Sequence, residues 1–230
     1  MINYCQALNL FKEIGNENGV GICSNNIGNI HLKNKRYIEA IERYEISLEI
    51  INSEINEYMN QNQDNFSPRI MLSDENFRKT IKSRADRASQ LAKAMLRKFQ
   101  SKKISNINES TSEEIEKIIT LLNSANENYH ELTLLISKII LNKIDISLAY
   151  LLKLDISSSK NNIEEAEALL KDFKKKELSL SLIPKEVLVQ KILVQKGLIE
   201  KEIGNMKKAA EYFTESIETI QEYDPATKKQ

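Results

Sequence analysis

Glycine and proline are scarce in this chain, and tryptophan is missing altogether. The 230 residues include 6 glycines and 3 prolines. Both residues commonly mark the turns that separate short strands, so their scarcity argues against a protein of many strands. It favours long helices joined by short connections.

The chain also lacks a net charge, because Lys+Arg and Asp+Glu both number 33. The whole chain is therefore not attracted to nucleic acid or to an anionic membrane, and an electrostatic partner would need a local patch. The two cysteines, Cys5 and Cys23, form no CxxC pair. This predicts neither a disulfide framework nor a zinc site, and it fits a reducing, cytoplasmic location.

Long hydrophobic runs are absent as well. The richest apolar stretch, 132–154, is interrupted by Lys138, Lys143, Asp145 and Lys153, which predicts a buried helix rather than a membrane span. The N-terminus has no basic segment followed by an apolar run, so no signal peptide is expected.

What the chain does have is helical periodicity. Apolar residues recur at intervals of three and four along nearly the whole length, which predicts nine helices. These are expected over 2–14, 19–33, 36–59, 74–100, 110–128, 131–157, 163–176, 184–204 and 206–223. The polar segment 60–72 is a predicted linker, and the polar run 157–162 is a predicted break between helices.

Capping residues predict where two of these helices begin. Ser73 precedes the fourth helix and is its expected N-cap, because a serine hydroxyl accepts a hydrogen bond from the first turn. The fifth helix has two possible capping boxes, Ser110 with Glu113 or Thr111 with Glu114.

A small residue followed four positions later by a large apolar one recurs along the chain. Ala7 and Phe11 recur as Ala40 and Tyr44, and Ala166 and Leu170 recur as Ala209 and Phe213. Small residues such as Gly28 allow two helices to approach closely, and large ones fill the space around them. A single hairpin cannot bury both of its faces, so neighbouring hairpins are expected to stack.

These residues resemble the tetratricopeptide repeat, whose pattern is W-x2-L-G-x2-Y, then A-x3-F, then P. Residues 21–50 match through Ile27, Gly28, His31, Ala40 and Tyr44, with Ser24 in place of Trp and His31 in place of Tyr. Residues 184–223 match through Gly204, Ala209 and Phe213, with Lys196-Gly197 in place of Leu-Gly. The clearest repeats are 1–50 and 184–223, while 131–176 matches only in its second helix and 73–128 weakly.

The resemblance implies an all-α, right-handed superhelix (α-solenoid) of antiparallel hairpins, forming one domain over 1–230. The segment 2–14 corresponds to the second helix of a hairpin without its first, which predicts either a piece of a longer chain or an unusual cap. The family implies a non-enzymatic scaffold for protein–protein interaction. Its partner, a peptide or a helix of another protein, would bind in the concave groove.

The first helix of each hairpin lines that groove in the family. The resemblance places five residues there: Ile22, Asn25, Asn26, Asn29 and Lys33. An asparagine amide offers both a donor and an acceptor, which matches the backbone of an extended peptide. The alternative is a polar, solvated stripe in an asparagine-rich chain.

A basic helix, 76–103, gives a second hypothesis, an anion-binding module for RNA or a phosphoinositide. Its cations are Arg78, Lys79, Lys82, Arg84, Arg87, Lys93, Arg97, Lys98, Lys102 and Lys103, against the single acidic residue Asp86. The residues proposed to bind the anion are Arg78, Lys82, Arg84 and Arg87. The alternative is a solvated face balanced by acidic neighbours, and nucleic acid is not the expected partner.

Nothing in the sequence predicts catalysis, a metal or a cofactor. His31 and His130 are the only histidines. His31 is expected to pack between helices, and the spacing of His130 and Glu131 is not that of metal ligands. No phosphate loop or nucleophile elbow is present.

Overall fold

The computed structural model describes residues 1–62, 73–101, 109–131, 136–172 and 183–223. Within these ranges the chain forms nine helices and no strand, as predicted: α1 Ile2–Glu13, α2 Glu17–Lys33, α3 Tyr37–Gln61, α5 Glu75–Ser101, α6 Glu109–Glu131, α7 Ile136–Leu152, α8 Ile156–Asp172, α10 Lys185–Glu202 and α11 Met206–Tyr223. The chain divides into two compact units. Unit 1 comprises Met1–Asn106 with Thr120–Asn128, and unit 2 comprises Ile107–Ile119 with Tyr129–Gln230.

Most predicted boundaries lie close to the observed ones, and the range predicted for α11 is confirmed. The predicted break at 157–162 is wrong, because these residues lie inside α8. The chain instead turns between Leu152 and Ile156. Asp155 is the N-cap of α8, where its carboxylate accepts a hydrogen bond of 3.0 Å from the backbone N–H of Ser158. The serines that indicated a loop therefore belong to the first turn of a helix.

The cap of α5 also differs from the prediction. Asp74, not Ser73, accepts the first-turn hydrogen bonds, from the backbone N–H groups of Asn76 at 2.7 Å and Phe77 at 3.2 Å. Both predicted capping boxes of α6 start inside that helix, which begins at Glu109. Most of the predicted linker, 63–72, lies outside the described residues.

Four turns between successive helices share one geometry. Each contains a residue in the left-handed conformation: Gly15, Lys35, Leu154 or Gly204, with φ of 67°, 59°, 61° and 87°. At the first, the N–H of Gly15 donates to the carbonyl of Lys12 at 3.3 Å, and the N–H of Asn16 to that of Phe11 at 2.8 Å. The other three turns repeat this pair of hydrogen bonds, which is the Schellman motif.

The turns also set the register of the helices that they join. Gly28 lies seven residues before Lys35, and a Cβ atom added to it would lie 2.8 Å from the Tyr44 ring. Gly197 lies seven residues before Gly204, and there a Cβ atom would lie 2.5 Å from the Phe213 ring. The hairpins α2–α3 and α10–α11 are therefore packed through equivalent positions.

The hairpin α7–α8 uses the same register with different chemistry. Ser147 lies seven residues before the left-handed Leu154 and occupies the glycine position. The Oγ of Ser159 donates to the Ser147 carbonyl at 2.9 Å and lies 2.9 Å from the Ser147 Oγ. Hydrogen bonds between two serines therefore join α7 and α8 at the level where the other two hairpins have a glycine.

This register corrects the repeat alignment made from the sequence. Counted from Leu154, Ser159 and Ile163 are the equivalents of Ala209 and Phe213. The predicted equivalence of Ala166 and Leu170 to Ala209 and Phe213 is displaced by seven residues, or two helical turns. The displacement followed from the wrongly placed break at 157–162.

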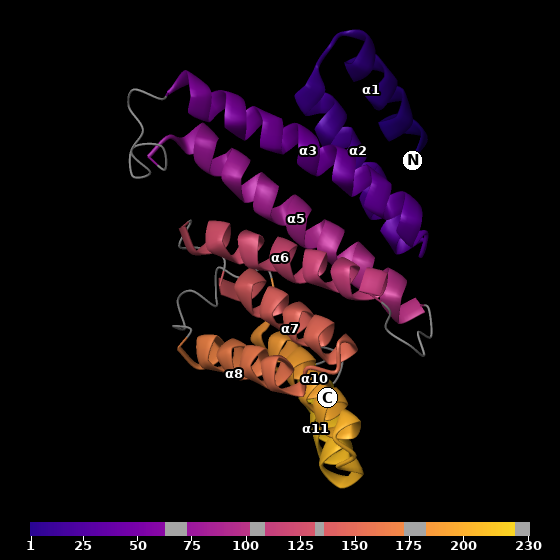
Figure 1. Ribbon diagram of the computed structural model, residues 1–230, viewed down its shortest axis with the longest axis vertical. Coiled ribbons are helices and arrows are strands. Elements are labelled where there is room, and N and C mark those ends of the chain that lie inside the picture. Colours follow the sequence, from indigo (N-terminus) through magenta and orange to yellow (C-terminus); the bar gives the residue numbers. More distant parts are fainter. Residues whose placement is uncertain (63–72, 102–108, 132–135, 173–182, 224–230) are drawn as a thin grey trace, which may run out of the picture. The chain divides into compact units, whose positions relative to one another are not determined.

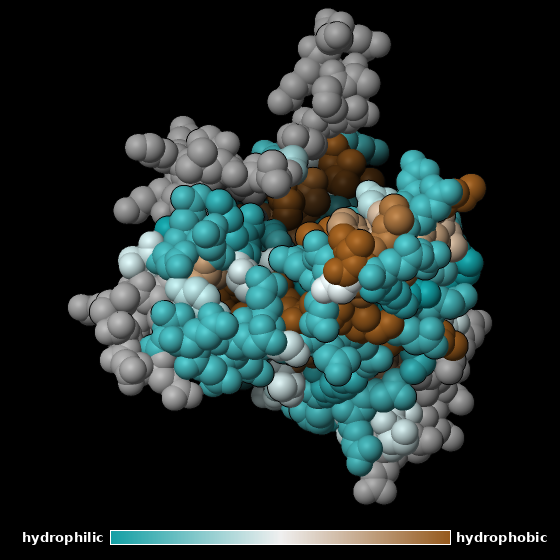
Figure 2. Space-filling model, turned by 90° about the horizontal axis from the view of Figure 1, so that it is seen from above, coloured by the Kyte–Doolittle hydropathy of each residue, from teal (hydrophilic) through white to brown (hydrophobic). Residues whose placement is uncertain are grey.

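In unit 1, helices α1, α2, α3 and α5 pack against one another in chain order (Figure 1). Leu8, Cys23 and Ile27 form a buried cluster between α1 and α2. Tyr58 of α3 stacks on Phe77 of α5, with ring centroids 4.6 Å apart. Figure 2, seen from the side of α1, shows hydrophobic side chains gathered among hydrophilic ones.

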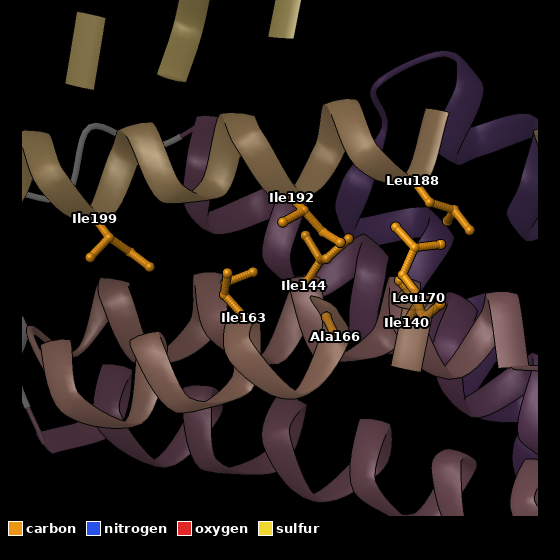
Figure 3. Close-up of a cluster of buried hydrophobic side chains, with 8 residues drawn as sticks. All are labelled: Ile140, Ile144, Ile163, Ala166, Leu170, Leu188, Ile192 and Ile199. Atoms are coloured by element: carbon orange, nitrogen blue, oxygen red, sulfur yellow. The ribbon is translucent and has the colours of Figure 1, made fainter. Parts of the chain in front are cut away.

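In unit 2, α10 packs against both helices of the α7–α8 hairpin. Figure 3 shows the buried side chains that meet there, from Ile140 and Ile144 of α7 to Leu188 and Ile192 of α10. The residue pairs Ile140–Leu188 and Ile144–Ile192 are both 48 positions apart, and Gln195 donates a hydrogen bond to Ser147 over the same interval. A constant interval means that α7 and α10 run parallel.

The turn at Leu154 yields a stability prediction. Leucine in the left-handed conformation costs about 1–2 kcal/mol, and glycine avoids this cost but gains entropy in the unfolded chain. We expect Leu154→Gly to raise the free energy of unfolding in urea by roughly 0.5–1 kcal/mol. Leu154→Ala keeps the strained backbone and is the matched control. A gain of the same size with alanine would contradict this explanation.

Candidate functional site

The five groove residues predicted on α2 differ in their exposure. Ile22 is 49% exposed and Lys33 is exposed as well, whereas Asn25, Asn26 and Asn29 are half-buried. Ile22 and Lys33 are accessible to a ligand, and each asparagine side chain is open to solvent over part of its surface.

One of the asparagines has an internal role. The Oδ1 of Asn29 accepts a hydrogen bond of 2.8 Å from the hydroxyl of Tyr44, which links α2 to α3. Burial raises the pKa of Tyr44 to about 12, so the phenol remains protonated and can donate at neutral pH. Asn29 therefore holds the aromatic ring that packs on Gly28, and its amide N–H groups remain for a ligand.

Asn25 is in the opposite situation. Its Oδ1 is buried and has no hydrogen-bond partner among the described residues. A buried acceptor without a partner costs about 1–3 kcal/mol, and because this oxygen is buried a ligand reaches it only if the side chain reorients. Asn25 lies four residues before Asn29 and so occupies the same side of the helix.

The basic helix, α5, uses part of its charge inside unit 1. Arg87 is only 6% exposed, and its Nη1 donates to the Ser47 carbonyl at 2.7 Å. The guanidinium passes beside Gly21, where a Cβ atom would lie 3.1 Å from Nη1. Burial lowers the pKa of Arg87. The Nε of Arg84 donates to the Oδ1 of Asn52 on α3 at 2.9 Å.

Of the four predicted anion-binding residues, Arg84 and Arg87 thus connect α5 to α3. Arg78 is half-buried and Lys82 is exposed. Lys102 and Lys103, at the end of the predicted basic helix, lie outside the described residues. The sequence gives the charge of each residue but not its burial. Helix periodicity alone therefore did not distinguish the buried Arg87 from the solvated cations.

His31 is buried, as expected from its place in the repeat, and its Nδ1 has no hydrogen-bond partner among the described residues. Burial and, secondarily, the nearby Arg36 lower the pKa of His31. His130 is exposed. Within the described ranges, no three His, Cys, Asp or Glu side chains gather where they could hold a metal ion. In the same ranges, no helix combines the length and hydrophobicity needed to cross a membrane.

A charged cleft in unit 2 was not predicted from the sequence. It has a volume of about 240 Å³ and is lined by side chains of α8, α10 and α11. Lys196 pairs with Glu167 at 2.6 Å, and Lys208 pairs with Glu200 at 2.9 Å. Both ammonium groups also lie over the Tyr212 ring, 5.5 Å and 5.8 Å from its centroid.

These ion pairs hold the three helices together rather than offering charge to a ligand. The hydrogen bond from Lys208 lowers the pKa of the Glu200 carboxyl. Glu200 and Lys208 lie four residues before and four after the left-handed Gly204. With the turn at Gly204 located, this symmetric spacing would have predicted the Glu200–Lys208 ion pair from the sequence.

The described helices define an all-α protein built from antiparallel hairpins with a common turn. Residues 190–223, which include Gly197, Gly204 and Phe213, match the family model for the tetratricopeptide repeat. A comparison with curated proteins gave no match. The match and the all-helical fold support a tetratricopeptide-like helical repeat protein, and proteins with this repeat typically serve as non-catalytic modules that bind other proteins.

The burial of His31 predicts a pH-dependent stability. Because the pKa of His31 is lowered in the folded state, the unfolded chain binds more protons below the ordinary histidine pKa of about 6.5. Stability is complete above that pH and is lost as the pH falls through the folded-state pKa. We expect the melting temperature, followed by circular dichroism, to fall between pH 7.5 and 5.5.

His31→Tyr is the matched variant, since tyrosine is the residue that the repeat pattern has at this position. Its melting temperature is expected to change less over the same interval, in which carboxylates with ordinary pKa values remain ionised. An equal pH dependence in both proteins would assign the effect to other groups.

Proposed function

We propose that this chain is a non-enzymatic scaffold that binds a peptide or helix of another protein along the groove face of α2. The match of residues 190–223 to the tetratricopeptide repeat carries the proposal. The polar face that includes Ile22, Asn25, Asn26, Asn29 and Lys33 is the binding surface. An extended peptide backbone would pair with the asparagine amides, and Ile22 would add an apolar contact.

Two observations support this surface. Asn25, Asn26 and Asn29 are half-buried on α2, so part of each residue is open to a ligand. Ile22 exposes 49% of its surface beside these amides. An exposed isoleucine flanked by half-buried amides combines apolar area with hydrogen-bonding groups, as peptide-binding surfaces do.

We further propose that the hairpins continue as one right-handed superhelix over 1–230, in the cytoplasm. The shared register of the turns at Lys35, Leu154 and Gly204 supports a repeating unit. The parallel packing of α7 and α10 supports stacking of successive hairpins within unit 2.

Anion binding by α5 is the competing hypothesis, and salt distinguishes it from groove binding. Binding to phosphate groups weakens steeply as salt is added, because counterions are released on association. With Arg87 buried and Arg84 bonded to Asn52, exposed Lys82 and half-buried Arg78 are the ones of the four predicted residues that remain available to such a ligand. Charge reversal of Arg78 and Lys82 would weaken phosphate-driven binding.

The groove hypothesis predicts that Asn25→Ala with Asn29→Ala releases bound partners. We expect the amount of partner protein recovered by affinity capture to be at least tenfold lower with the double variant than with the original chain. This reduction should be nearly the same at about 50 mM and at about 200 mM salt. Quantitative mass spectrometry of the captured proteins provides the measurement.

Tyr44→Phe is the matched control, because it removes the same Asn29 hydrogen bond from the interior and keeps all five groove residues. Partners should remain bound to this variant. If the double asparagine variant captures the same proteins as the original chain, the groove hypothesis is wrong.

A further inference from the structure

Unit 1 also contains a cleft apart from the asparagine positions. It lies between α1, α3 and the first turn of α2. Its volume is about 430 Å³, which falls in the range of ligand pockets. Phe11, Val20 and Ile50 supply its apolar walls, one from each helix, and all three are half-buried. Half-buried apolar side chains that converge from three helices offer an anchor for an apolar group.

The rim of this cleft is charged and unneutralised. It carries Lys12 from α1, Glu17 from α2 and Glu49 from α3, three exposed residues with a combined formal charge of −1. None of the three forms an ion pair with another described residue. The α3 rim belongs to an acidic helix, because residues 37–61 include six glutamates and a single basic residue, Arg43.

The charged cleft of unit 2 gives a comparison within the same chain, because carboxylates there are paired internally. There, Glu167 and Glu200 are each paired with a lysine of the unit itself. In the cleft of unit 1, the carboxylates of Glu17 and Glu49 are exposed to solvent, and the apolar side chains of the walls are half-buried. The cleft of unit 1 therefore offers a partner apolar area together with carboxylates that form no ion pair with another described residue.

We propose that the cleft between α1 and α3 docks a basic peptide segment of another protein. One large apolar side chain of that segment inserts between Phe11, Val20 and Ile50. A lysine or arginine next to it lies toward Glu17 and Glu49, on the side away from Lys12. Ile46, which is 39% exposed one turn before Ile50 on α3, extends the apolar contact along the helix.

Charge complementarity sets the specificity of this docking more than its strength. Glu17 and Glu49 are exposed to solvent, so each ion pair with the segment contributes modestly and is screened by salt. The apolar anchor supplies most of the affinity, and a carboxylate at the same place in the segment would be repelled. Acidic segments are therefore excluded from this cleft.

A random dodecapeptide display library selected against the full chain tests the proposal. We expect enrichment of peptides in which Leu, Phe or Met stands within a few residues of Lys or Arg. Ser53→Trp fills the cleft from its exposed rim and should weaken these peptides at least tenfold, as measured by fluorescence polarisation. Ser157→Trp, at an exposed position of α8 in unit 2, is the matched control and should bind normally.

Glu17→Gln with Glu49→Gln gives an independent reading that leaves the cleft open. It should weaken the basic peptides roughly fivefold to tenfold at low salt and less at high salt. The Asn25→Ala, Asn29→Ala variant should bind the selected peptides unchanged, which separates this site from the groove face. Absence of enrichment, enrichment of acidic sequences, or unchanged binding to Ser53→Trp or to the Gln variant would overturn the proposal. So would loss of binding in the asparagine variant.

Discussion

The helices of a hairpin approach most closely where one of them carries almost no side chain, and this contact organises both units. In α2–α3 the ring of Tyr44 lies on Gly28, and in α10–α11 the ring of Phe213 lies on Gly197. In both hairpins the left-handed residue of the turn fixes the register, with the glycine seven positions before it. The ring then fills the space that the glycine leaves, as close packing requires.

The same contact connects packing to the proposed binding face. Tyr44 lies on Gly28 and donates to Asn29, which lies beside that glycine on α2. The groove face is thus held by the residue that closes the hairpin. In unit 1 the buried Arg87 adds a second connection, because it bonds the Ser47 carbonyl while the Ser47 Oγ donates to the Gly21 carbonyl at 2.7 Å. The proposed binding face on α2 is therefore held by side chains of three helices.

Sequence reasoning located most helices because apolar spacing reports which face of a helix is buried. It failed at 157–162, where serines and asparagines indicated a loop. Those residues are helical because Asp155 is the N-cap of α8. Leu154, just before it, takes the left-handed conformation that glycine takes in two other turns. A turn made by leucine leaves no compositional signal. Burial of Arg87 was equally invisible, because it depends on the absence of a side chain at Gly21, on another helix.

A double-mutant cycle between Gly197 and Phe213 tests the hairpin contact most directly. Gly197→Ala should lower the free energy of unfolding in urea by roughly 1–3 kcal/mol in the original chain, because the added methyl group overpacks against the ring. In a Phe213→Ala background the same change should be neutral or should stabilise by up to about 1 kcal/mol, the difference in helix propensity between the two residues. An equal loss of stability in both backgrounds would contradict the account.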